Sequence, residues 1–115
     1  MEDVVIIRQK ISKEEIKRLA ERRFGDMVKI VVDTRRHIMA AGGELHADEE
    51  AVLLKDGSEQ KDLWGINIYP DEPEEKWVEF DSMINIRPSQ ENRSLNVENS
   101  EVRKKITSVI KNLVE

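Results

Sequence analysis

The spacing of hydrophobic and polar residues predicts short strands in the first third of the chain. Residues 4–7 form a continuous apolar run of β-branched side chains, which favours an extended strand. Apolar residues return at 27–32 and again at 37–41, and the polar stretch 33–36 between them is typical of a turn. We therefore predict an N-terminal strand followed, after a helix, by a β-hairpin.

Helical spacing appears between that first strand and the hairpin, and again at the end of the chain. Ser12 and Glu15 have the spacing of a capping box, and an apolar stripe follows until Gly25 ends the pattern. The stripe consists of Ile16, Leu19, Ala20 and Phe24. After a loop over residues 88–99, apolar residues recur from Val102 onward at the three- and four-residue spacing of one helix face. The two patterns predict two amphipathic helices.

The middle of the chain contains one ambiguous segment and two alternating ones. Residues 48–54 show no strict alternation, and we favour a short helix, capped by Asp48 and ended by Asp56-Gly57, over a strand. Apolar and polar side chains alternate through 63–69 and again through 77–87, which predicts two strands. The connection between them is acidic and contains proline, so we expect a surface loop.

Together these elements predict a single domain over residues 1–115, with the order β-α-β-β-(short α)-β-β-α. We expect an α+β fold, a two-layer sandwich in which about five mostly antiparallel strands carry two main helices on one face. The other face should remain uncovered, because the last predicted strand alternates between apolar and polar residues. Its inward residues would be Val78, Phe80, Ser82, Ile84 and Ile86, and its outward residues Trp77, Glu79, Asp81, Met83, Asn85 and Arg87.

Composition narrows the classes of function. The chain has no cysteine, hence no disulfide or thiolate site, and it has no apolar run long enough to span a membrane. Its acidic start lacks the basic region of a secretory signal, so we expect a cytoplasmic protein. The net charge of −5 and the lack of aromatic residues among the basic ones disfavour nucleic-acid binding. Charge is also uneven: residues 8–36 hold ten Lys and Arg against five Asp and Glu, whereas residues 44–81 hold three against thirteen.

The uncovered sheet face is the first candidate site. If residues 63–69 and 77–83 pair as a hairpin, Asn67 lies beside Glu79 and Gly65 beside Asp81. The face would then hold a set of side chains able to hydrogen-bond or ionise: Asn67, Tyr69, Glu79, Asp81, Asn85 and Arg87. Two carboxylates on one strand face suit acid–base chemistry, but a solvated surface with cross-strand ion pairs explains them equally simply.

The segment Arg87–Ser94 is the second candidate. Arginine recognises phosphate and carboxylate groups through paired N–H donors, and a turn rich in amides and hydroxyls can complete an anion site. The segment contributes Ser89, Gln90, Asn92 and Arg93 in addition to Arg87. The alternative is a structural turn whose arginines pair with the acidic middle of the chain.

His46 and the acids that follow it form the third candidate. His46 with Asp48, or with Asp81 from the sheet face, would combine an imidazole with a carboxylate, as in a general acid–base pair. A helix start with an acidic first turn accounts for the same residues. Zinc spacing, a glycine-rich phosphate loop and a Ser-His-Asp order are all missing, so we expect no metal and no cofactor.

Three phrases of the sequence resemble a small prokaryotic family of unknown function. They are Gly43-Glu44-Leu45-His46-Ala47-Asp48, Leu63-Trp64-Gly65-Ile66-Asn67, and Phe80-Asp81-Ser82-Met83-Ile84-Asn85-Ile86-Arg87-Pro88 continuing to Arg93-Ser94. The resemblance extends from the first helix to the last. It implies a prokaryotic origin and no particular activity.

These observations favour a non-enzymatic binding or interaction module. Its outward sheet face and the Arg87–Ser94 loop would engage an anionic small molecule or a protein partner, including another copy of the chain. The alternative is a small hydrolase-type enzyme that uses His46 with Asp48, Glu79 or Asp81 as acid–base groups or metal ligands, and the sequence does not decide between the two functions. A purely structural oligomer subunit would instead expose an apolar patch around Leu63, Trp77 or Met83.

Overall fold

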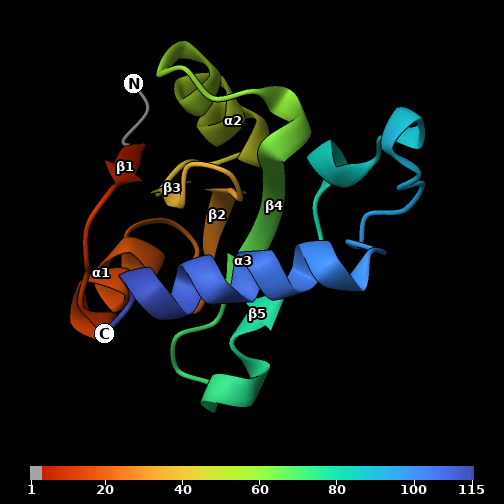
Figure 1. Ribbon diagram of the computed structural model, residues 1–115. Helices are drawn as coiled ribbons and strands as arrows, with labels where there is room; N and C mark the ends of the chain where they lie inside the picture. The colour runs from red at the N-terminus through yellow and green to blue at the C-terminus, as the bar shows by residue number, and fades with distance from the viewer. Residues whose placement is uncertain (1–3) are drawn as a thin grey trace.

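The computed structural model describes residues 4–115, which contain five strands and three α-helices, with a long irregular segment between the last strand and the last helix (Figure 1). The strands are β1 (Val5–Ile7), β2 (Val28–Asp33), β3 (Ile38–Ala41), β4 (Leu63–Ile68) and β5 (Val78–Glu79). The helices are α1 (Lys13–Arg23), α2 (His46–Lys55) and α3 (Ser100–Leu113). The short helix predicted at 48–54 is thus present and begins two residues earlier.

The strands form one antiparallel sheet in the order β1-β3-β2-β4-β5. The predicted hairpin of β2 and β3 is confirmed, and so is the pairing of β4 with β5 across the acidic loop. Asn67 lies opposite Glu79, as the alternation predicted. The α+β class is therefore confirmed.

Two helices cover one face of the sheet, and α3 crosses in front of β2, β4 and β5 (Figure 1). Asn99 caps α3 by accepting hydrogen bonds from the amides of Glu101 and Val102. The predicted stripe of α3 is buried against the sheet together with the stripe of α1. The buried helical residues of this layer are Ile16, Leu19, Ala20, Ile106, Val109, Ile110 and Leu113.

The opposite face is not open, contrary to the expectation from the alternating pattern. α2 packs over β2 and β3, and Leu53 of this helix lies in a second apolar cluster with Val31 and Leu63. All six residues of β4 are buried as a result. The alternation predicted which residues share a face, but not that a third helix would cover part of it.

The predicted strand over 77–87 is largely wrong. Pairing stops after Glu79, and residues Met83–Asn85 form a 3₁₀ turn. The hydroxyl of Ser82 caps this turn by accepting a hydrogen bond from the amide of Ile84 at 3.3 Å. Trp77, predicted to point outward, is buried in the main core. Only β5 retains the predicted strand conformation.

Two local predictions for the helices also need correction. Ser12 caps α1 by accepting a hydrogen bond from the amide of Glu15 at 3.2 Å, as predicted, but Phe24 at the end of the stripe is 38% exposed. The ammonium of Lys29 lies 5.6 Å from the centroid of the Phe24 ring. Asp48 is not the cap of α2, because Leu45 occupies that position without a side-chain hydrogen bond.

Candidate functional site

A hollow of about 560 Å³ opens beside β4 and β5, and we call it the β4–β5 hollow. Its lining residues come from β2, the start of α2, the β4–β5 hairpin and the segment after β5. Five residues that the sequence singled out lie there together: His46, Asn67, Tyr69, Glu79 and Asp81. They are 35 positions apart at most along the chain, and the antiparallel register brings them together.

Hydrogen bonds organise the polar floor of the hollow around Glu79. The Asn67 amide donates to Glu79 Oε1 at 2.9 Å, and the Tyr69 hydroxyl donates to the same oxygen at 3.1 Å. Partial burial and the neighbouring carboxylate raise the pKa of Tyr69, so its hydroxyl remains a donor. Asn67 also donates to the carbonyl of Asp81 at 3.3 Å. The carboxylate of Glu79 is thereby held in a defined position on the floor.

His46 is buried at the first turn of α2 and faces β4. Its Nε2 lies 2.8 Å from the carbonyl oxygen of Ile66. Since a carbonyl only accepts, Nε2 must hold the proton and Nδ1 is left as an acceptor. Burial lowers the pKa of His46, and the nearby Lys29 acts in the same direction. His46 is therefore a neutral imidazole with one nitrogen committed to the sheet.

Gly65 explains why α2 and the segment after β5 can approach β4 so closely. A Cβ atom built on Gly65 would lie 2.5 Å from Ser82 Oγ and 3.2 Å from His46 Cδ2. No real side chain tolerates the first distance. The glycine thus leaves the space in which Ser82 and His46 meet the strand.

The rim of the hollow is apolar and exposed. Met83 is 76% exposed, Leu45 55% and Leu95 40%. Exposed large apolar side chains are ordinary when scattered singly, but three of them around one concave site offer contact area to a ligand or partner. A structural oligomer subunit was predicted to expose an apolar patch around Leu63, Trp77 or Met83. Of these three residues, Leu63 and Trp77 are buried and only Met83 lies on the surface.

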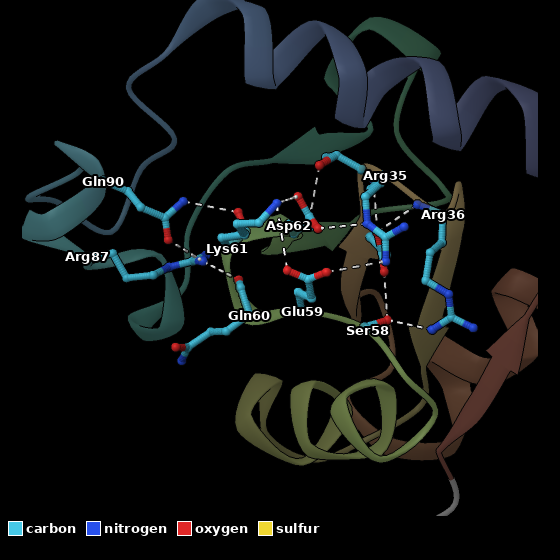
Figure 2. Close-up of polar contacts among 11 residues, drawn as sticks. Arg35, Arg36, Ser58, Glu59, Gln60, Lys61, Asp62, Arg87 and Gln90 are labelled. Atoms are coloured by element: carbon cyan, nitrogen blue, oxygen red, sulfur yellow. Dashed lines mark hydrogen bonds and ion pairs between the residues drawn. The ribbon is translucent and has the colours of Figure 1, made fainter.

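Arg87 lies outside the hollow and is 9% exposed. Its guanidinium donates to the carbonyls of Gln60 and Leu63, and its Nε donates to the carbonyl of Ile84 at 3.1 Å. Figure 2 shows Arg87 and Gln90 reaching toward the backbone around Gln60 and Lys61. The guanidinium N–H groups of Arg87, which the sequence suggested would bind an anion, thus donate to backbone carbonyls. This geometry favours a structural role for Arg87.

Asn85 and Asn92 are likewise buried and bound to backbone groups. The Asn85 side chain accepts from the amide of Gly65 at 2.8 Å and donates to the carbonyl of the same residue at 3.0 Å. These two hydrogen bonds take the place of those that a longer β5 would have formed with β4 at Gly65. Asn92 donates to the carbonyls of Asn85 and Asn96, each at 2.7 Å. Both residues organise the 85–98 segment.

The remaining predicted residues lie away from the hollow. Ser89, Gln90 and Asn92 border a separate depression that also includes the acidic Glu91 and Glu98. The side chain of Arg93 is exposed, and Asp48 is half-buried within α2. The structure does not gather these residues with the hollow.

Sequence reasoning did not name the other eight lining residues of the hollow as site candidates: Met27, Lys29, Leu45, Ala47, Ser82, Met83, Ile84 and Leu95. Leu45 was named only within a phrase of the family resemblance, and Met83 only in the last predicted strand, in such a phrase and in the apolar patch of an oligomer subunit. Helix and strand periods do not mark these residues as one site, because they come from separate elements and turns that tertiary packing brings together. Only an apolar residue at a position expected to be exposed, next to polar residues, would have pointed to them.

The fold and the hollow define a small α+β domain with one polar-floored, apolar-rimmed surface site. The chain belongs to the family described as Protein of unknown function (DUF5674), whose model matches residues 5–113. No curated protein and no solved structure matches it. Within residues 4–115, no three His, Asp or Glu side chains gather as a metal site would require, and no helix is long and apolar enough to cross a membrane.

Proposed function

We propose that this protein is a binding module whose ligand or partner occupies the β4–β5 hollow. The observation behind the proposal is the convergence of His46, Asn67, Tyr69, Glu79 and Asp81 under an exposed apolar rim. Binding sites combine mostly apolar walls with a few placed polar groups in this way. The Oδ1 atom of Asn67 is also buried without a hydrogen-bond partner in residues 4–115, and such groups call for an explanation.

The charges of the hollow indicate which ligand chemistry suits it. Two carboxylates, Glu79 and Asp81, line it against one ammonium, that of Lys29. The ammonium of Lys29 lies over the Phe24 ring and forms no ion pair with Glu79 or Asp81. The floor therefore favours a group that donates hydrogen bonds or bears positive charge, attached to an apolar body. The anionic ligand expected from the sequence depended on Arg87, Arg93 and the polar turn between them. Arg87 donates four hydrogen bonds within the protein, and Arg93 does not line the hollow.

A pair of probes of similar size and opposite charge tests this proposal. We expect phenethylammonium to shift amide NMR signals of β4, β5 and the start of α2, and phenylpropionate to shift them much less. Asp81→Asn should weaken the ammonium response, whereas Glu74→Gln, an exposed acid on the hairpin loop, should leave it unchanged. Equal shifts from both probes, or none from either, would count against the hollow as a site for such groups.

A second candidate is the small hydrolase-type enzyme, and one observation favours it: His46 and Asp81 line the same hollow. Nδ1 of a neutral His46 would serve as the base. The test is hydrolysis of a panel of simple esters by the native protein and by His46→Gln. Activity that persists in the variant, or no activity in either, removes this candidate.

A further inference from the structure

A second concave surface lies at the opposite edge of the sheet, and we call it the β1–α1 groove. It measures about 390 Å³ and touches every residue from Val5 to Ile11. On α1 it is bordered by Glu15, Arg18, Leu19 and Arg22, whose three- and four-residue spacing defines one stripe of the helix. Neighbouring residues of a strand point to opposite faces, so a groove that touches all of them follows the backbone itself.

Within that backbone β1 is an open sheet edge, whereas the N–H and C=O groups of Ile11 are already paired with Leu113 and Glu115. β1 pairs with β3 on one side only, through Val5 with Ala41, Ile6 with Ala40 and Ile7 with Met39. Among residues 4–115, no strand pairs with its other side. Edge strands present unpaired N–H and C=O groups that can accept another extended chain.

The groove also holds positively charged side chains that have no ionic partner among residues 4–115, although such side chains occur elsewhere on the surface as well. Lys17 and Arg23 on the flanks of α1 form ion pairs with Asp71 and Glu44. By contrast, Lys10, Arg18 and Arg22 in the groove form none within the part of the chain that the structure describes. Those three cations surround a floor that includes Leu19 and the 40% exposed Val5.

We propose that the β1–α1 groove binds an extended acidic segment of another protein, which adds to the sheet as a strand beside β1. The open edge supplies backbone pairing and the three free cations supply the preference for acidic side chains, a known mode of peptide recognition. This inference is independent of the β4–β5 hollow, which lies at the other end of the sheet.

A segment of a second copy fits less well than a partner's segment. The most acidic exposed part of this chain is residues 71–75, but it contains Pro73 and leads into a 3₁₀ turn at Glu74–Lys76. Proline cannot donate to a sheet ladder, and a 3₁₀ turn is not extended. The chain therefore offers no extended acidic strand of its own at that position.

The first experiment measures fluorescence anisotropy of a labelled peptide of alternating glutamate and valine. We expect binding that weakens about tenfold or more when NaCl rises from about 50 to about 500 mM. The double variant Arg18→Glu/Arg22→Glu should also lose about tenfold or more. Lys104→Glu/Lys105→Glu on α3 changes the net charge by the same amount away from the groove, and it should bind like the native protein.

The second experiment uses the native protein and so does not depend on whether a variant folds. The same peptide with an N-methyl group on every backbone amide keeps its charges but cannot donate to a ladder on either edge. We expect it to lose binding, and we expect the unmodified peptide to protect additional β1 amides from hydrogen exchange. Equal binding of the methylated peptide would overturn strand addition. Absence of peptide binding, together with self-association that Arg18→Glu/Arg22→Glu abolishes, would assign the groove to a second copy and overturn the proposal.

Discussion

The guanidinium carbon of Arg87 lies 4.2 Å from the centroid of the Trp64 ring. The stacked group also donates to the carbonyls of Leu63 and Ile84, so it joins the start of β4 to the segment that follows β5. This contact fixes the turns after β5, and those turns in turn hold Met83 at the rim of the β4–β5 hollow. A residue that resembles an anion ligand in the sequence thus supports the site from outside.

Arg87→Lys should destabilise the protein despite keeping the charge. An ammonium cannot stack in the same way or reach three carbonyls at once, so buried acceptors lose their donors. We expect a loss on the order of 2 kcal/mol in the free energy of unfolding, measured by urea titration. Arg93→Lys is the matched control and should change little, because the Arg93 side chain is exposed and forms no hydrogen bond or ion pair with residues 4–115. Equal stability of both variants would contradict the structural role.

Gly65→Ala should destabilise through a direct clash. The new methyl group would lie 2.5 Å from Ser82 Oγ and 2.6 Å from Ser82 Cβ, which requires backbone movement. The expected cost is about 1–3 kcal/mol. Ser82→Gly removes the clashing atoms, so the double variant should be less destabilised than the sum of the single changes. Strict additivity in thermal unfolding would show that the two residues do not meet as described.

Asn85→Asp keeps the shape of the side chain but removes its donors. The carboxylate would face the carbonyls of Gly65 and Leu95, which now accept hydrogen bonds at 3.0 Å each. We expect a loss of about 2–4 kcal/mol near neutral pH, smaller in acid where the new group is protonated. Asn96→Asp is the control, because Asn96 uses its side-chain oxygen as an acceptor for the amide of Val97 and an aspartate can do the same. If Asn85→Asp leaves the free energy of unfolding in urea unchanged, the hydrogen bonds between the Asn85 side chain and the backbone of Gly65 are not as described.

Glu49 should make stability fall as pH rises. Burial raises its pKa to about 9 from an ordinary value of 4.5, although the carboxyl accepts a hydrogen bond from the amide of Gly43 at 2.9 Å. Between these two pH values the unfolded chain has released the proton that the folded chain retains. Stability therefore decreases with pH in that window, by up to about 1.4 kcal/mol per pH unit from this group.

Glu49→Gln tests that expectation. The variant should unfold at higher urea concentration than the native protein at pH 8, and its stability should change less between pH 5 and pH 8. Glu74→Gln, on an exposed residue, should leave the native slope in place. If Glu49→Gln retains the native pH dependence, the buried carboxyl is not the group responsible.

The sequence was informative wherever a pattern depends on near neighbours. The capping residue Ser12, the stripe of α3 and the opposition of Asn67 and Glu79 were all predictable, because helix and strand periods relate residues a few positions apart. The gathering of Tyr69 and Glu79 on one face followed from the same period. The position of His46 in the hollow did not follow from it, because that position depends on where α2 packs against the sheet.

By itself, then, the sequence determined the α+β class, the main helices, the hairpins and the register that places Asn67 beside Glu79. Only the tertiary structure decided that α2 covers the second face, that the chain turns away after Glu79, and that Arg87 and Asn85 bind backbone groups instead of a ligand. The physical reason is the separation along the sequence between the residues that interact. Periodicity is encoded by adjacent residues, whereas a buried side chain's partners, such as Leu63 and Gln60 for Arg87, come from segments more than twenty positions away.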